Sequence, residues 1–227
     1  MKSSKNKKFY TGESQPENKL VEYHDYFIKN KNKKINVKHL GEKTAQMSSY
    51  FFEYLKGYNI ASAFVEKESK KKLRLLNTND FRFHIKIINS TDARTAKIFS
   101  AKVGSPLQLP LIEYHYGSSK ETLVTESHLI SFNLCTYDEL KLMNRLCSKI
   151  NAILISYLER RNTLLLELTC IFGKFEGKIY LVGDFSPDSI KVFNNEKIDK
   201  LPDPYKIESF AQMRKYSDYL LKLTNGD

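Results

Sequence analysis

Residues 164–188 read LLLELTCIFGKFEGKIYLVGDFSPD, and the interpretation of the whole chain starts from this stretch. Two runs rich in apolar and aromatic residues, Leu164 to Phe172 and Lys178 to Val182, flank the connection Gly-Lys-Phe-Glu-Gly. Such runs are typical of β-strands, and a glycine-containing connection of this length predicts a β-hairpin with a five-residue loop.

The hairpin carries two carboxylates. Strand alternation places Leu166, Leu168, Cys170 and Phe172 on one face, and Glu167, Thr169 and Ile171 on the other. Asp184 ends the second strand, so we expect Glu167 and Asp184 on neighbouring strands, where carboxylate oxygens can hold Mg²⁺ together with nucleotide phosphates. A strand-end carboxylate paired with a lysine explains the same pattern equally well.

The flanking sequence predicts helices and further strands. Thr136 and Glu139 form a capping-box pattern at the start of a long amphipathic helix. Its apolar stripe consists of Leu140, Met143, Cys147, Ile150, Leu154 and Leu158. Other predicted elements are a helix over Glu42 to Lys56 that stops at Gly57, strands over Leu20 to Phe27, Leu73 to Leu76 and Phe81 to Ile88, and a last helix over Ile207 to Leu223. This mixed order predicts an α+β fold.

Composition limits the class of protein. The chain has 227 residues, of which 41% are hydrophobic, enough for a well-buried core. No apolar run approaches the roughly 20 residues that span a bilayer. The basic N-terminus lacks the apolar segment of a secretory signal, so we expect a cytoplasmic protein without a membrane partner. The three cysteines are scattered, which predicts reduced, mostly buried thiols.

The net charge of +11 favours anionic partners. Lysine-rich stretches such as Lys29 to Lys34 lack the aromatic interleaving of a nucleic-acid platform, so nucleic acid is not a favoured partner. Small phosphorylated and carboxylated metabolites fit the same charge.

Several segments resemble the SAICAR synthetase family, whose members join aspartate to a carboxyaminoimidazole ribotide with ATP. LLELTCIFG at Leu165 to Gly173 resembles the family's LVDFKLEFG strand, and LVGDFSPDSIKVF at Leu181 to Phe193 resembles its LxDExSPDxxRLW segment. Weaker matches are Lys5 to Tyr10 with GKTKxxY, Asn89 to Lys97 with RNxxAGSxxKR, and Pro110 to Tyr116 with PxxEFYY.

The resemblance implies a small N-terminal β-rich nucleotide-binding lobe over residues 1–80 and a larger α+β substrate- and metal-binding lobe over residues 81–227, with a nucleotide cleft between them. It implies ATP and Mg²⁺ as cofactors and a possible homo-oligomer. The implied function is an ATP-dependent amide-forming ligase of de novo purine biosynthesis. The alternatives are a family member that ligates a different acid and amine, and a non-catalytic nucleotide- or metabolite-binding paralogue.

The resemblance also assigns site residues one by one. Glu167, Asp184 and Asp188 fall on catalytic positions, of which Glu167 and Asp184 would hold the metal. Nucleotide-binding positions are Lys5, Lys7 and Glu167, and substrate-binding positions are Asn89, Arg94, Lys97, Lys191 and Lys200.

This chain departs from the family pattern at several of these places. The family's hairpin lysine is Thr169, its second hairpin carboxylate is Ile171, and the arginine before Asn89 is Ile88. Asp184 aligns either within Gly183-Asp184 or beside a deleted glutamate. Strand alternation suggests that Arg82 and Lys86, which share a face with Ile88, or else Arg94, restore the lost positive charge.

Overall fold

The computed structural model describes residues 7–12, 15–29, 33–117, 122–194 and 201–225. Within them the chain forms a mixed α+β fold, which confirms the predicted class. The described helices are α1 (Leu40–Lys56), α2 (Ala93–Ile98), α3 (Glu126–Ser131), α4 (Tyr137–Glu159) and α5 (Phe210–Lys222).

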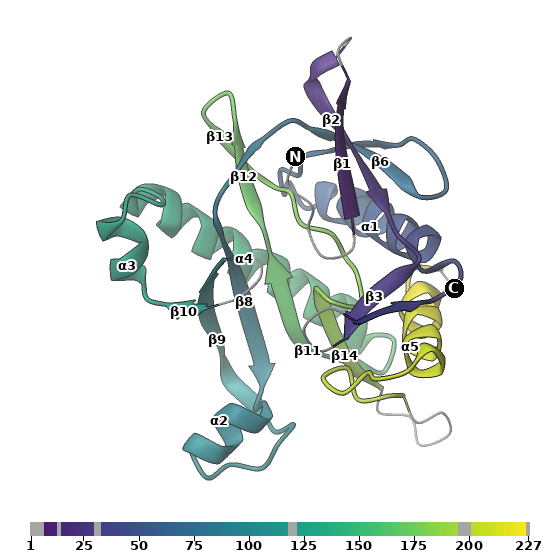
Figure 1. Ribbon diagram of the computed structural model, residues 1–227. Helices are drawn as coiled ribbons and strands as arrows, with labels where there is room; N and C mark the ends of the chain where they lie inside the picture. Colours follow the sequence, from purple (N-terminus) through teal and green to yellow (C-terminus); the bar gives the residue numbers. More distant parts are fainter. Residues whose placement is uncertain (1–6, 13–14, 30–32, 118–121, 195–200, 226–227) are drawn as a thin grey trace.

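A five-stranded antiparallel sheet forms the platform of the molecule, with α4 behind it (Figure 1). Its strands in spatial order are β10 (Thr122–Val124), β9 (Pro106–Tyr116), β8 (Phe83–Ser90), β11 (Thr163–Cys170) and β14 (Ile190–Asn194). α4 packs on β11 and β8, so one face of the sheet is buried and the other is available for a site.

A second sheet gathers strands from the first third of the chain. Its order is β1 (Lys7–Gly12), β2 (Gln15–Tyr23), β6 (Lys72–Leu76) and β5 (Phe64–Lys67), and α1 packs against it. α5 lies beside α1 although the two helices are far apart in sequence (Figure 1).

Two small antiparallel sheets complete the architecture. One consists of β13 (Lys178–Leu181), β12 (Phe172–Phe175) and β7 (Asn79–Asp80), and the other of β3 (Tyr26–Lys29) and β4 (Lys33–Asn36). The predicted strand over Leu20 to Phe27 is therefore wrong as a single element, because the chain turns at His24 and Asp25 between β2 and β3.

The first strand of the hairpin lies later in the chain than predicted, because the pairing partner of β13 is β12 and not the run from Leu164 to Phe172. The hairpin pairs β12 with β13 through a two-residue turn, in which Glu176 and Gly177 have φ values of 47° and 77°. Two successive positive φ values match the twist of the strands, which explains the tight turn. Gly173 lies inside β12, where a Cβ atom would come within 2.7 Å of the Thr78 hydroxyl. Glu167 and Asp184 are consequently not on neighbouring strands, since Asp184 lies in the loop after β13.

A β-bulge in β11 changes which side chains face the core, so the predicted alternation is wrong at the start of this strand. The register with β14 shifts between Leu165 and Glu167, so Leu165 is buried and Leu166 is only half-buried. After the bulge the alternation holds, with Leu168 and Cys170 facing the core. Bulges reorient side chains locally, and this one sets the orientation of Glu167.

The helix predictions agree closely with the structure. The capping box at Thr136 and Glu139 is present, with each backbone N–H bonded to the other's side chain at 2.9 and 3.2 Å. Every predicted stripe residue of α4 is buried. α1 ends at Lys56 as predicted, but Gly57 keeps a right-handed helical conformation, and Asn59 adopts the left-handed one instead. The last helix is shorter than predicted.

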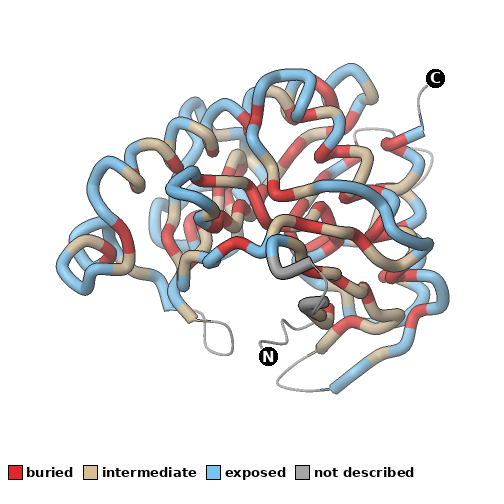
Figure 2. The backbone as a smooth tube through the Cα atoms, turned by 90° about the horizontal axis from the view of Figure 1, so that it is seen from above, coloured by how far each residue is buried: buried red, intermediate tan, exposed pale blue. Residues whose placement is uncertain are grey.

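One apolar core joins the two larger sheets and their helices. Figure 2 shows the buried positions along the backbone. The core contains α4 residues such as Leu154, α1 residues such as Phe52 and sheet residues such as Ile85. The three cysteines are free and buried, as predicted. Among the described residues, no helix has the length and apolarity needed to cross a membrane.

Candidate active site

A cleft of about 1080 Å³ lies over the exposed face of the five-stranded sheet. Its walls come from β1, from the β2–β3 region, from β8 and β11, and from the loop between β13 and β14. The polar and charged side chains in its lining include Lys7, Asp80, Arg82, His84, Lys86, Asp92, Glu167, Thr169, Asp184, Asp188 and Lys191. The cleft therefore offers both cations and carboxylates to a ligand.

Lys7 and Asp184 form an ion pair at one end of the cleft. Lys7 Nζ donates to Asp184 Oδ2 at 2.8 Å, and both side chains are more than four-fifths buried. Burial first, and then the nearby Asp184 carboxylate, raise the pKa of the Tyr23 phenol well above its usual value. Charge-assisted pairs of this kind are strong when water is excluded, so the loop carrying Asp184 is firmly attached to β1.

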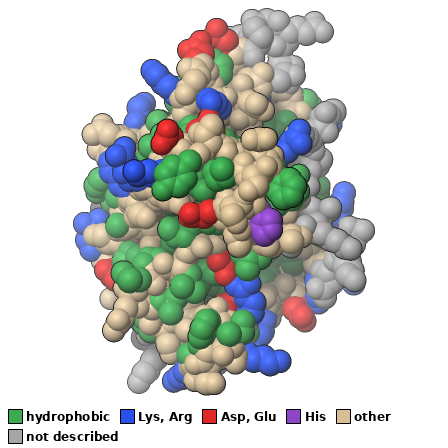
Figure 3. Space-filling model, turned by 90° about the vertical axis from the view of Figure 1, so that its left-hand side faces the viewer, with side chains coloured by type: hydrophobic (Ala, Val, Ile, Leu, Met, Phe, Trp, Pro, Cys, Tyr) green, Lys and Arg blue, Asp and Glu red, His purple; other side chains and the backbone are tan. Residues whose placement is uncertain are grey.

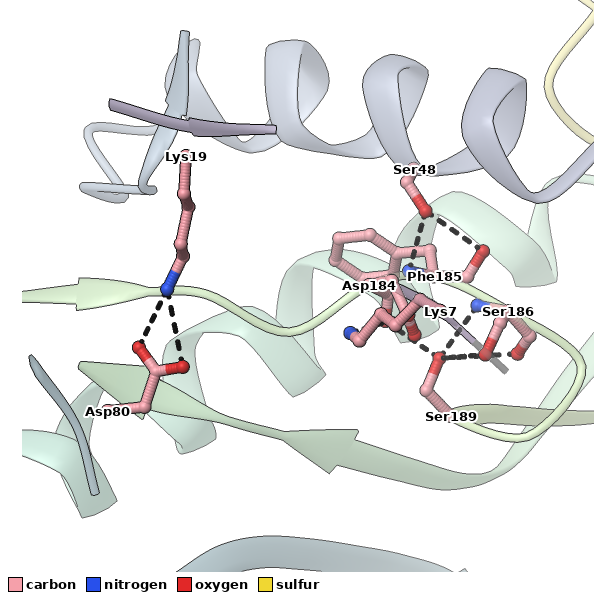
Figure 4. Close-up of polar contacts among 8 residues, drawn as sticks. All are labelled: Lys7, Lys19, Ser48, Asp80, Asp184, Phe185, Ser186 and Ser189. Carbon is pink, nitrogen blue, oxygen red and sulfur yellow. Dashed lines mark hydrogen bonds and ion pairs between the residues drawn. The ribbon is translucent and has the colours of Figure 1, made fainter. Parts of the chain in front are cut away.

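Ser48 of α1 holds the same loop from the opposite side (Figure 4). The Phe185 N–H donates to Ser48 Oγ at 3.0 Å, and Ser48 Oγ in turn lies 3.4 Å from the Phe185 carbonyl. Within the loop, Ser189 Oγ accepts from the Ser186 N–H and donates to the Asp184 carbonyl, each at 2.7 Å. These bonds satisfy buried polar groups and fix the backbone that presents Asp184.

Glu167 reaches the cleft from the bulged part of β11. Its cross-strand neighbours are Lys191 on β14 and Ile88 on β8. Tyr205 also lines the cleft, and burial of its hydroxyl there, together with the charges of Glu167 and Asp92, raises the pKa of its phenol. Lys191 Nζ donates to the Pro187 carbonyl at 2.8 Å, which draws β14 and the Ser186–Pro187–Asp188 turn together.

The ten predicted site residues divide into three groups. Lys7, Glu167, Asp184, Asp188 and Lys191 line the cleft. Asn89, Arg94 and Lys97 are not among its lining residues. Lys5 and Lys200 lie outside the described residues.

Asn89, Arg94 and Lys97, which do not line the cleft, lie elsewhere in the structure. The amides of Asn89 and Asn151 of α4 exchange two hydrogen bonds, at 2.8 and 2.9 Å, so Asn89 links β8 to the helix. Arg94 is exposed on α2 and pairs with Glu113 of β9. The hydrogen bond from His115, together with the charge of Arg94, lowers the pKa of Glu113 despite its partial burial. Lys97 is exposed on α2.

Of the residues suggested to restore the lost positive charge, Arg82 and Lys86 line the cleft, whereas Arg94 does not. Both cleft-lining residues precede Ile88 by an even number of positions, so strand alternation correctly placed them on the cleft side. Ile88 itself is buried.

A second charged pair lies beside the cleft and was not predicted from the sequence. Lys19 of β2 is nearly fully buried and donates to Asp80 Oδ1 at 3.0 Å and to Thr78 Oγ1 at 3.1 Å (Figure 4). The ring of Phe9 lies between Lys19 and Lys7, at 5.7 and 5.8 Å from the two ammonium groups. Lys19 follows four polar or turn-forming residues and precedes the apolar pair Leu20–Val21, so no local pattern marked it as buried, and its partner lies 61 residues away.

The side chains that line the cleft include possible ligands for a metal ion. Among the described residues, no cluster of three or more His, Cys, Asp or Glu side chains is placed to hold a metal ion. The cleft nevertheless contains the Glu167 and Asp184 carboxylates, and Mg²⁺ commonly takes one or two carboxylates together with substrate phosphates. The donor set fits a cation shared with a nucleotide rather than one enclosed by protein alone.

Comparisons with known proteins agree over almost the entire chain. The SAICAR synthetase family model matches residues 1–209. A phosphoribosylaminoimidazole-succinocarboxamide synthase from Clostridium novyi is 26% identical over 227 residues, covering 98% of this chain and 96% of the relative. The solved structure of such a synthase from Ehrlichia chaffeensis is 22% identical, with a TM-score of 0.89 and coverage of 98% of this chain and 97% of that one. A SAICAR synthetase solved in complex with ADP is 21% identical, with a TM-score of 0.85 and coverage of 97% and 96%.

Proposed function

Because the chain belongs to the SAICAR synthetase family of ATP-dependent ligases in purine biosynthesis, we propose that it joins aspartate to carboxyaminoimidazole ribotide. The observation that carries this proposal is the cleft, where Lys7, Glu167, Asp184, Asp188 and Lys191 meet although they come from four separate segments. A scaffold without a ligand has little physical reason to gather these charges, because each partly buried charge costs solvation energy.

The proposed reaction has two steps. A carboxylate oxygen of the ribotide attacks the γ-phosphorus of ATP, which forms an acyl phosphate and releases ADP. The amine of aspartate then attacks the acyl carbon, a proton leaves the nitrogen, and inorganic phosphate departs as the amide forms. Both steps develop or move negative charge, so a cleft that positions the reactants and neutralises this charge accelerates them.

Different residues of the cleft have different proposed roles. Lys7, held beside Asp184 at 2.8 Å, supplies a cation for the nucleotide phosphates. Lys191, next to Glu167 across β11 and β14, supplies one for the ribotide. When bound, Mg²⁺ would be held by Glu167 and Asp184 and would neutralise phosphate charge. Ser48 and Ser189 keep the Asp184 loop in place and thereby keep Lys7 in position.

Calorimetry with Mg-ATP followed by an ADP-release assay with the ribotide and aspartate tests the proposal. We expect nucleotide binding and turnover that needs both substrates. Asp184→Asn should abolish turnover, whereas Asp138→Asn, which changes an exposed aspartate in the first turn of α4, should leave turnover unchanged.

Absence of nucleotide binding would refute the ligase activity. Binding without turnover would point instead to a different acid and amine, which other amino-acid and carboxylate pairs would then identify in the same assay. An Asp184→Asn variant that turns over at the wild-type rate would remove this loop from the reaction.

The remaining expectations from the family resemblance are part of the proposal. They are the division into lobes 1–80 and 81–227, the cytoplasmic location and a homo-oligomer. Phe99 next to α2, Leu109 on β9 and Phe132 next to α3 are exposed apolar residues. Figure 3 shows apolar side chains at the surface of one face of the molecule. Apolar surface of this kind is where a second copy would pack, and light scattering on purified protein measures the oligomeric state.

A further inference from the structure

Lys86 of β8 occupies a cleft position that the family resemblance does not assign. In the sheet register, Lys86 lies directly opposite Thr169 of β11. Both residues line the cleft. Side chains that face each other across antiparallel strands have Cβ atoms about 5 Å apart, so the Lys86 side chain can reach the space above Thr169.

The family motif carries its lysine on the middle strand, at the position of Thr169. In this chain that strand presents a hydroxyl group, and the neighbouring strand presents the ammonium group. The displacement is a single strand spacing of about 4.8 Å, which is shorter than a lysine side chain. Lys86 therefore carries an ammonium group close to the part of the sheet where the family motif has its lysine.

A second lysine approaches from the opposite side of β11. Lys191 of β14 lies opposite Glu167, two residues before Thr169, and it also lines the cleft. Lys86 and Lys191 thus flank β11 from its two neighbouring strands, Lys86 opposite Thr169 and Lys191 opposite Glu167. Two lysines and a hydroxyl in the lining of one cleft provide hydrogen-bond donors suited to an oxyanion.

We propose that Lys86, Thr169 and Lys191 form an oxyanion subsite over β11 that binds the carboxylate of the acid substrate. This inference rests on the proposed ligase function, because it identifies the group that holds the acid at the same cleft. The same cleft is also lined by Lys7, beside which the nucleotide phosphates are proposed to bind.

A charge relocation tests the subsite. Lys86→Thr removes the ammonium group and should weaken binding of carboxyaminoimidazole ribotide about tenfold or more in calorimetry, because a charge-assisted hydrogen bond is lost. The double variant Lys86→Thr/Thr169→Lys returns the ammonium group to the middle strand and should recover affinity to within about threefold of wild type. Lys178→Thr changes an exposed strand lysine on β13 and should have no effect.

Two further probes identify the source of the oxyanion. Aminoimidazole ribotide keeps the phosphate but lacks the carboxylate, so its affinity should change less than twofold in Lys86→Thr. Mg-ADP affinity should likewise be unchanged. Equal weakening of both ribotides, or weakening of Mg-ADP, would overturn the assignment to the carboxylate.

The controls separate this inference from the proposed function. A Lys86→Thr variant that is folded in a urea titration and binds the carboxylated ribotide as tightly as wild type would refute the subsite while leaving the ligase function intact. The same holds if the double variant is folded and recovers no affinity. Wild-type protein that binds neither Mg-ADP nor the ribotide would overturn both proposals.

Discussion

The two faces of the five-stranded sheet show how one set of strands serves both stability and a site. On the face covered by α4, Ile85, Ile87, Leu168 and Cys170 are almost completely buried. On the cleft face, alternate positions of the same strands carry Lys86, Glu167 and Thr169. The difference lies in what covers each face, since a long amphipathic helix excludes water from one and the cleft admits ligand to the other.

Neighbouring residues of β11 are therefore expected to respond very differently to substitution. Leu168 and Glu167 are adjacent in sequence, but only the first packs in the core. The bulge between Leu165 and Glu167 makes this division possible, because it turns Glu167 towards the cleft while Leu165 and Leu168 stay buried.

The largest effect is expected on the packed face. Leu168→Ala should lower the free energy of unfolding by about 2–5 kcal/mol, because it removes buried methyl groups and leaves a cavity against α4. Urea denaturation followed by circular dichroism measures this change. A loss below 1 kcal/mol would show that the two faces are less distinct than the burial indicates.

The matched substitution on the cleft face should affect activity instead. Glu167→Gln keeps size and removes charge, and it should lower kcat/KM about 100-fold or more, equivalent to roughly 2.7 kcal/mol. Its free energy of unfolding should stay within about 0.5 kcal/mol of wild type, as for other substitutions outside the core. The ADP-release assay and a urea titration of the same preparation give both values. Loss of stability without loss of activity would reverse the roles of the two faces.

A smaller effect is expected where α1 supports the cleft. Ser48→Ala leaves the buried Phe185 N–H without its acceptor and should cost about 1–2 kcal/mol of stability. We also expect weaker nucleotide binding, since the Asp184 loop loses its attachment to α1. Ser49→Ala is the control, because Ser49 bonds only locally to the Gln46 carbonyl in the described structure. Equal behaviour of the two alanine variants would argue against the supporting role of Ser48.

The smallest effect concerns the start of α4. Glu139 is partly buried, which raises its pKa, but the Lys174 ammonium at 2.5 Å and the Thr136 N–H outweigh this and lower the pKa below its usual value. A depressed pKa stabilises the folded state above the unfolded pKa of about 4.3, and this contribution disappears as pH falls through the folded pKa.

Glu139→Gln retains the capping geometry and should cost only about 0.5 kcal/mol at pH 7, because the Lys174 side chain is nearly half exposed to solvent. The difference from wild type should be smaller at pH 3 than at pH 7 in urea titrations at both pH values. A difference that is undiminished at pH 3 would mean that the charge of Glu139 is not its source.

Local signals predicted the helices and the apolar faces well. The Thr136 capping box, the buried stripe of α4 and the alternation of β8 all depend on residues a few positions apart, so the sequence displays them directly. The hairpin was predicted less well. Its turn depends on Glu176 adopting a positive φ, and its strand β12 pairs with β7, nearly 100 residues earlier. Neither feature is visible in a local pattern.

The residues of the candidate site were also predicted only in part from the sequence. Resemblance to a family suggested Lys7, Glu167, Asp184, Asp188 and Lys191, and the structure places all five in the lining of one cleft. It suggested Asn89, Arg94 and Lys97 as well, but these side chains contact α4, β9 or solvent instead.

The amino-acid sequence by itself determined which residues could be buried, which could cap a helix and which family the chain resembles, because these depend on composition and short spacings. Only the tertiary structure placed Lys7 against Asp184, which is 177 residues away, and Lys86 opposite Thr169 on the neighbouring strands β8 and β11. Such pairs form when sheet register and a bulge bring distant segments together, and strand register is set by the packing of the whole sheet rather than by either strand alone.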